Sequence, residues 1–150
     1  MTASQITKGG NRYMVYLTRR VTFSASHRLW SNHLSEEENY IVYDKCANPN
    51  GHGHNYILEV TVRGEPDRKT GMVLNLTDMK RIVNEQVIDL VDHKHLNYDV
   101  PWLEEVIPTT EMLVIKFWER LEPAFAGLLY DVTLHETENN QASYRGSTCA

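Results

Sequence analysis

Several features are scarce or absent in this sequence of 150 residues. Its two cysteines, Cys46 and Cys149, stand too far apart to suggest a disulfide framework, so we expect reduced thiols. No apolar run approaches the roughly 18 residues of a membrane-spanning helix, and the first ten residues lack the apolar region of a secretory signal. Basic charge is not in excess, because the formal net charge is −5. We therefore expect a cytoplasmic protein that binds neither membrane nor nucleic acid.

The overall composition is that of a folded protein. Hydrophobic residues make up 41% of the chain and charged residues 23%, close to the average for globular domains. The length suits a single domain with one core. Residues 1–11 are small and polar, which predicts a flexible N-terminal tail followed by one domain over residues 12–150.

Two segments alternate between apolar and polar residues, as strands with one buried face do. The first covers residues 13–25, and His27 falls next on its apolar positions. The second covers residues 56–62, and His52 and His54 share the parity of its apolar positions. The imidazoles of both strands are therefore predicted to point toward the buried face.

Two later segments have apolar residues at the spacing of a helix. Apolar residues between positions 79 and 91 recur every three or four residues, with Thr77 or Asp78 as the expected N-cap. A second helix is expected to start at Thr109 and to end at Pro123, whose ring disfavours continuation.

Three further segments are predicted to be strands, namely residues 72–76, 129–137 and 142–145. The order of elements then indicates an α+β fold, with the helices on one face of an antiparallel sheet. A sheet of this kind has free edges, which favours pairing with other subunits.

Three histidines form the most informative cluster of the sequence. His52 and His54 lie two apart on one strand and His27 lies on another, so their rings are able to converge on one Zn²⁺ ion. Three neutral ligands leave a fourth coordination position open, which is typical of catalytic sites. The alternative is that each histidine is an ordinary hydrogen-bonded residue near a strand end.

A thiol and a carboxylate–imidazole pair are candidates for acid–base chemistry. Cys46 precedes the turn that leads to the histidine pair, and a nearby cation would favour its thiolate; the alternative is an inert buried thiol. Asp92 and His93 end a predicted helix, where the carboxylate can orient the ring. The alternative is that the pair supplies only a charge that complements the dipole at the C-terminal end of the helix.

Polar side chains near the last two strands are candidates for binding a ligand. If the strand continues to Glu136, its carboxylate points to the buried face and needs a partner, which a planar heterocycle with adjacent N–H donors would supply. The alternative is an exposed Glu136 beyond the strand end. Thr109 and Thr110 are expected to meet a ligand ring, although helix capping explains one of them equally well.

Five motifs in this order resemble the 6-pyruvoyl-tetrahydropterin synthase family, and the resemblance extends over roughly residues 13–147. The motifs are Phe23–Leu29 (FSASHRL), Cys46–Tyr56 (CANPNGHGHNY), Asp92–Lys94 (DHK), Thr109–Glu111 (TTE) and Glu136–Asn140 (ETENN). The resemblance implies a tunnelling fold (T-fold): a four-stranded antiparallel sheet with two helices on one face, whose strands join between subunits into a barrel. It also implies a homohexamer built as a dimer of trimers, with sites at subunit interfaces.

The same resemblance implies a role for each candidate residue. His27, His52 and His54 correspond to the ligands of one zinc ion per subunit, Cys46 to the general base, and Asp92 with His93 to the rest of the relay. Glu136 corresponds to the pterin anchor, and Thr109 and Thr110 to residues that line the pterin pocket.

The implied activity is a carbon–oxygen lyase of tetrahydrobiopterin biosynthesis. The enzyme would convert 7,8-dihydroneopterin triphosphate to 6-pyruvoyl-tetrahydropterin and triphosphate, with Mg²⁺ as an expected companion of the triphosphate. Arg28, Lys45 and Lys94 are equal candidates for holding that triphosphate.

Two other functions remain open. One is 6-carboxytetrahydropterin synthase, but the five residues between Cys46 and His52 match the animal pyruvoyl enzymes better than the shorter link of that branch. The other is a non-catalytic zinc- or pterin-binding module, which would not need a relay. His95 and Met112 depart from the family pattern, where we expect Asn or another polar residue.

Overall fold

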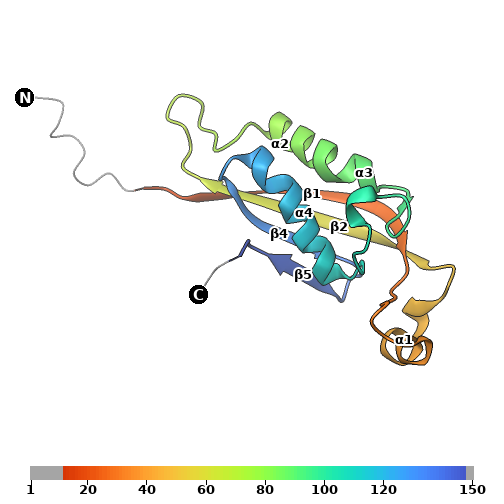
Figure 1. The fold of residues 1–150 in the computed structure, drawn as a ribbon. Helices are drawn as coiled ribbons and strands as arrows, with labels where there is room; N and C mark the ends of the chain where they lie inside the picture. Colours follow the sequence, from red (N-terminus) through yellow and green to blue (C-terminus); the bar gives the residue numbers. More distant parts are fainter. Residues whose placement is uncertain (1–11, 148–150) are drawn as a thin grey trace, which may run out of the picture.

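The computed structural model describes residues 12–147, so the predicted tail over residues 1–11 lies outside the described part of the chain. Figure 1 shows a long sheet with helices packed along one side of it. The elements are β1 (Val15–His27), α1 (Glu36–Tyr43), the 3-10 helix η2 (Asp44–Ala47), β2 (His52–Gly64), α2 (Leu76–Val83), the π-helical segment η3 (Asn84–Ile88), α3 (Asp89–Val91), β3 (Lys94–His95), the 3-10 helix η4 (Pro101–Leu103), α4 (Thr110–Phe125), β4 (Leu129–His135) and β5 (Gln141–Tyr144).

The sheet has the strand order β3-β1-β2-β4-β5. Strands β1, β2, β4 and β5 pair antiparallel, which confirms the predicted four-stranded antiparallel core of an α+β fold. The two-residue β3 adds a short parallel pairing to β1. It was missed because two residues are too few to show a period. The long β1–β2 hairpin ends with His27 opposite His52, so strand pairing brings two of the candidate ligands together.

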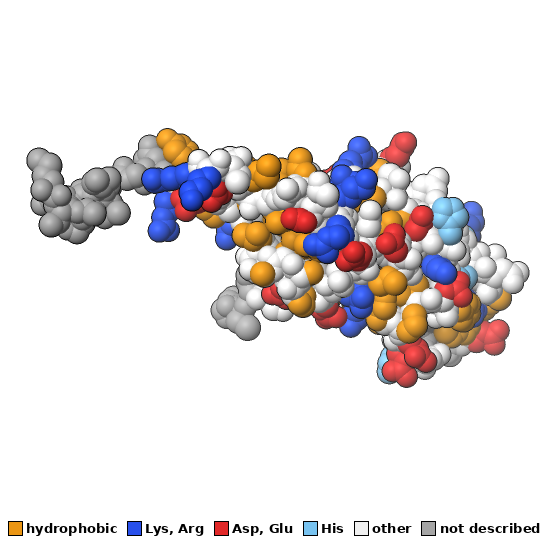
Figure 2. Space-filling model, turned by 90° about the horizontal axis from the view of Figure 1, so that it is seen from above, with side chains coloured by type: hydrophobic (Ala, Val, Ile, Leu, Met, Phe, Trp, Pro, Cys, Tyr) orange, Lys and Arg blue, Asp and Glu red, His pale blue; other side chains and the backbone are white. Residues whose placement is uncertain are grey.

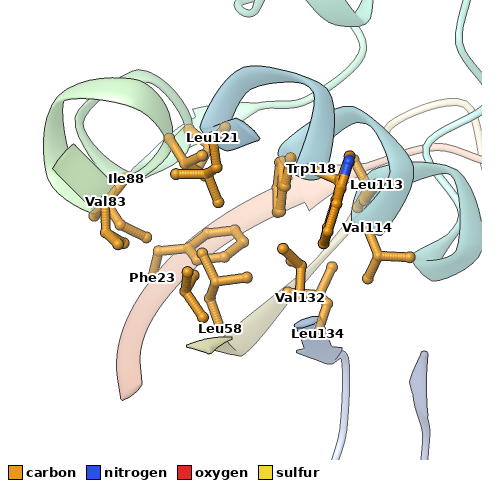
Figure 3. Close-up of a cluster of buried hydrophobic side chains, with 14 of the residues drawn as sticks. Phe23, Leu58, Val83, Ile88, Leu113, Val114, Trp118, Leu121, Val132 and Leu134 are labelled. Atoms are coloured by element: carbon orange, nitrogen blue, oxygen red, sulfur yellow. The ribbon is translucent and has the colours of Figure 1, made fainter. Parts of the chain in front are cut away.

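Side-chain alternation decides which face of the sheet is covered. Along β2 the even-numbered side chains Tyr56, Leu58, Val60 and Val62 are fully buried, as the sequence pattern predicted. Figure 3 shows Phe23, Leu58, Val132 and Leu134 of the sheet meeting side chains of the α2–α3 segment and of α4. The core therefore lies between one face of the sheet and the helices, and the other face carries polar side chains.

The first predicted helix is present but begins earlier than expected. Its N-cap is Asn75, whose side-chain oxygen accepts a 2.9 Å hydrogen bond from the backbone N–H of Thr77. Neither Thr77 nor Asp78 is the cap. The helical path continues through the π segment η3 to Val91, and this wider turn keeps Val87 and Ile88 buried against the sheet.

Residues 72–76 do not form the predicted return strand. Both edges of β2 are already taken, by β1 and by β4, so this segment has no ladder to join. The loop before it is organised by Asp67, whose carboxylate accepts backbone hydrogen bonds from Lys69 and Thr70 at 2.8 and 3.0 Å. Met72 remains 48% exposed.

Two boundaries in the C-terminal half also differ from the prediction, and one helix in the N-terminal half was missed. Helix α4 continues past Pro123 to Phe125 and ends at Ala126 in a left-handed conformation (φ 48°). A proline in the last turn removes only one helical hydrogen bond. Strand β4 ends at His135, so Glu136 belongs to the following turn and not to a strand. The helix α1 was not predicted, although Ser35 and Glu38 form a capping box at its start.

The surface carries charges of both signs. In the view of Figure 2, acidic and basic side chains are interspersed rather than segregated into one broad patch. Within residues 12–147, every helix falls short of the length and apolar character needed to cross a bilayer.

Candidate functional site

Three imidazoles converge at the end of the β1–β2 hairpin. His27 and His52 are cross-strand partners, and their Nε2 atoms lie 3.2 Å apart. One nitrogen from each of His27, His52 and His54 falls within 4.8 Å of the others. Two nitrogens bound to one tetrahedral Zn²⁺ at 2.0–2.1 Å are about 3.3 Å apart. The geometry therefore fits the predicted metal site.

The surroundings of His27 keep its imidazole ring neutral. Its side chain is 1% exposed, and its Nδ1–H donates a 2.8 Å hydrogen bond to the carbonyl oxygen of Pro108. That bond leaves the lone pair on Nε2, which faces the other imidazoles. Burial, reinforced by the neighbouring imidazoles, lowers the pKa of His27 to about 4 against the opposing effect of the Pro108 hydrogen bond. The ring is therefore unprotonated near neutral pH.

His54 supplies a second sign of a metal site. Its Nε2 atom is buried and has no hydrogen-bond partner within the described residues. Burial lowers the pKa of His54, and Glu136 opposes this shift. Since a buried imidazole nitrogen normally has a partner, a metal ion would account for this unpaired atom.

A half-buried carboxylate lies beside the imidazoles. Glu136 Oε1 is 3.7 Å from His54 Nε2, and Glu136 Oε2 accepts a 2.9 Å hydrogen bond from the hydroxyl of Thr110. The turn after β4 positions this side chain, since the backbone N–H of Glu136 donates to the carbonyl of Asn140 at 3.1 Å. Glu136 thus points inward although β4 has already ended, and the alternative of an exposed residue does not hold.

Glu136 also lines a cavity of about 520 Å³. Its other walls come from the segment after β1, the start of α4 and the β4–β5 turn, that is from Leu29, Thr109, Thr110, Glu111, Asn139, Asn140, Gln141 and Ala142. Thr109 is the N-cap of α4, where its hydroxyl accepts from the backbone N–H of Met112 at 3.2 Å. Of the two threonines, Thr110 is therefore the one whose hydroxyl contacts the carboxylate.

Cys46 lies in the 3-10 helix η2 and is partly buried. Burial raises the pKa of its thiol, and the nearby carboxylates of Glu136 and Asp44 add to this effect. The predicted depression of the pKa by a cation is thus not produced by the side chains of this chain alone.

Asp92 and His93 form the expected pair, with Asp92 Oδ1 3.0 Å from His93 Nδ1. Asp92 also accepts a 2.9 Å hydrogen bond from the backbone N–H of Ser24, which is the main reason that its pKa is lowered. His93 is 82% exposed and lines a different depression, of about 510 Å³. Within the described part of a single chain, no hydrogen bond or ion pair joins Asp92 or His93 to Cys46.

Tyr56 is a site neighbour that the sequence reasoning missed. Its hydroxyl lies 3.4 Å from His27 Nδ1 and the side chain is fully buried, which raises its pKa. Its parity in β2, shared with His52 and His54, was the signal that would have found it.

An α+β subunit with this sheet order and this group of imidazoles defines a tunnelling-fold protein with a candidate three-histidine metal centre. The family model described as 6-pyruvoyl tetrahydropterin synthase matches residues 16–147. The chain belongs to this family, and it is an enzyme of the lyase class.

Individual relatives agree with this assignment. The chain is 48% identical to human 6-pyruvoyl tetrahydrobiopterin synthase over 139 residues, covering 92% of this chain and 96% of the human one. The identity to the Drosophila melanogaster enzyme of the same name is 49% over 135 residues, which is 89% of this chain and 80% of the relative. A putative 6-carboxy-5,6,7,8-tetrahydropterin synthase of Archaeoglobus fulgidus is 37% identical over 104 residues, covering 69% and 81% of the two chains.

Solved structures support the fold. The Caenorhabditis elegans 6-pyruvoyl tetrahydropterin synthase superposes with a TM-score of 0.87 at 40% identity, covering 93% of this chain and all of the other. The Plasmodium falciparum enzyme has a TM-score of 0.60 at 16% identity, with coverage of 92% and 100%, and so shows the fold alone.

Proposed function

We propose that this protein converts 7,8-dihydroneopterin triphosphate to 6-pyruvoyl-tetrahydropterin and triphosphate, as a step of tetrahydrobiopterin biosynthesis. The observation that carries the proposal is the position of Glu136, which reaches the imidazole group with one oxygen and the 520 Å³ cavity with its side chain. A substrate seated on this carboxylate would have its side chain beside His27, His52 and His54.

In this proposal His27, His52 and His54 hold one zinc ion per subunit. Zinc, when bound there, supplies a Lewis acid that acidifies the carbon-bound protons of the substrate's side chain. The unpaired His54 nitrogen and the 3.2 Å spacing of the His27 and His52 nitrogens support this ligand set.

The protein side chains have distinct tasks. Glu136 accepts hydrogen bonds from two adjacent N–H groups of the pterin ring, and Thr110 orients that carboxylate. Cys46 accepts a carbon-bound proton from the substrate as general base. His93, oriented by Asp92, completes the relay.

We further propose that the relay is completed between subunits. Within one chain His93 is 82% exposed and forms no hydrogen bond or ion pair with Cys46, so it is free to face a neighbouring molecule. In a homohexamer of two trimers, the sheets of adjacent subunits would pair edge to edge into a barrel. An adjacent subunit would then be the molecule that His93 faces. The free edges at β5 and at the N-terminal part of β1 support such pairing.

The archaeal relative keeps 6-carboxytetrahydropterin synthase as a second candidate. The experiment that separates the two is an anaerobic incubation of reduced, zinc-loaded protein with 7,8-dihydroneopterin triphosphate, followed by mass spectrometry. A pterin that keeps its three-carbon side chain without triphosphate supports the proposal. A carboxylated pterin with released acetaldehyde would support the second candidate, and unchanged substrate would point to a binding module.

A further inference from the structure

The backbone of Cys46 is held by the segment that follows His27. The N–H of Leu29 donates to the carbonyl oxygen of Cys46 at 2.8 Å, and the Nε–H of Arg28 donates to the carbonyl oxygen of Ala47 at 2.9 Å. Two consecutive residues therefore bind two consecutive carbonyls. Because η2 spans only four residues, these outside bonds are a large part of what fixes its position.

Arg28 is itself held on two sides. Its guanidinium carbon lies 4.1 Å from the centroid of the Trp30 ring. This cation–π contact restricts the orientation of the guanidinium group relative to the ring. The side-chain amide of Asn97 bonds both the N–H and the carbonyl of Arg28, each at 2.8 Å. The ring of Trp30 in turn packs edge-on against Tyr40 of α1, with 5.7 Å between the ring centroids.

We propose that Arg28 is a positioning residue that holds the Cys46 thiol in register with the metal ligand His27, and that it does not act as a triphosphate ligand. The proposal rests on the proposed role of Cys46 as general base. A base must lie within hydrogen-bond reach of the proton that it removes, and displacement by about 1 Å costs up to about a hundredfold in rate. Arg28 directly follows the proposed metal ligand His27 in the chain, and its side chain bonds the turn that carries the thiol.

The chemistry of arginine makes this role specific. The bond to Ala47 comes from Nε, and the stacking on Trp30 needs a delocalised planar group. Lysine has the same charge but offers neither feature. If Arg28 served only as a positive charge for the triphosphate, the Arg28→Lys variant would keep its activity. If Arg28 positions Cys46, the Arg28→Lys variant will lose activity as Arg28→Gln does.

The test compares Arg28→Gln, Arg28→Lys and Trp30→Leu with the control Arg68→Gln, which removes the same charge from an exposed loop. Four quantities are measured on the zinc-loaded protein: kcat, KM for the pterin triphosphate, bound zinc, and the rate at which iodoacetamide alkylates Cys46. Peptide mass spectrometry separates Cys46 from Cys149. Trp30→Leu removes the stacking platform without changing any charge.

We expect kcat to fall about tenfold or more in both Arg28 variants and several-fold in Trp30→Leu, with KM changed by less than about twofold. Alkylation of Cys46 is expected to rise about threefold, because a loosened turn exposes the thiol, while bound zinc and the Arg68→Gln control stay unchanged.

Two results would overturn the proposal. A raised KM with unchanged kcat, restored by Arg28→Lys, would assign Arg28 to the triphosphate. Unchanged kcat and alkylation in Arg28→Gln would remove any positioning role. Full turnover by Cys46→Ala would refute the role of Cys46 as general base. In that case the alkylation rates of Cys46 in the Arg28 variants would still show whether Arg28 holds the turn.

Discussion

Replacing Glu136 by glutamine isolates the charge at the centre of the site. The carboxylate accepts the Thr110 hydroxyl at 2.9 Å and lies 3.7 Å from His54 Nε2. Glutamine keeps the size of the side chain and one acceptor oxygen, so the contact with Thr110 can persist. It loses the negative charge and, in the proposed complex, presents an NH₂ group to one of the two pterin N–H donors.

The expected loss follows from these contacts. A hydrogen bond to a charged group contributes about 1.5–3 kcal/mol, so losing one and weakening the other costs about 3 kcal/mol of substrate binding. At about 1.4 kcal/mol per factor of ten, kcat/KM falls about a hundredfold. If the proposed zinc site is correct, the metal content should be the same as in the unaltered protein, because the three imidazoles are unchanged.

The assay is steady-state kinetics with the pterin triphosphate, together with metal analysis of each protein. Glu138→Gln is the matched control, since this glutamate lies in the same turn but is exposed. If Glu136→Gln keeps kcat/KM within about twofold of the unaltered protein, the carboxylate does not anchor the substrate and the reasoning fails.

Three further predictions concern the thiol, His27 and the core. Cys46→Ala should keep zinc but lose about 10²–10⁴-fold in kcat, as removal of a general base does; turnover near that of the unaltered protein would exclude this role. For the metal-free protein, the free energy of unfolding in urea should fall by about 2 kcal/mol between pH 7 and pH 5. The unfolded chain protonates His27 near pH 6.5 whereas the folded chain does so only near pH 4, and a flat profile would contradict this. Leu58→Ala, at a fully buried position in the central strand β2, should lower the free energy of unfolding by about 3 kcal/mol, whereas a loss below about 1 kcal/mol would place Leu58 outside the tightly packed core.

Local patterns in the sequence were sufficient to predict most of the helices and strands of the fold. Alternation along β2 identified its buried side chains, and helical spacing identified α4 and the run from α2 to α3. The same reasoning failed at residues 72–76, because their apolar character was read without knowing that β4 takes the free edge of β2. It also placed Glu136 in a strand, although a turn is what directs its carboxylate inward.

For the candidate site, the sequence by itself determined the chemistry of the residues and the tertiary structure decided their partners. His27, His52 and His54 were recognised together because strand parity and spacing are local properties of the chain. The hydrogen bond from His27 to Pro108, the contact of Glu136 with Thr110, and the hydrogen bond from Arg28 to Ala47 join residues that are 81, 26 and 19 positions apart. Such contacts depend on how the helices and turns close over the sheet, and no local pattern encodes that closure.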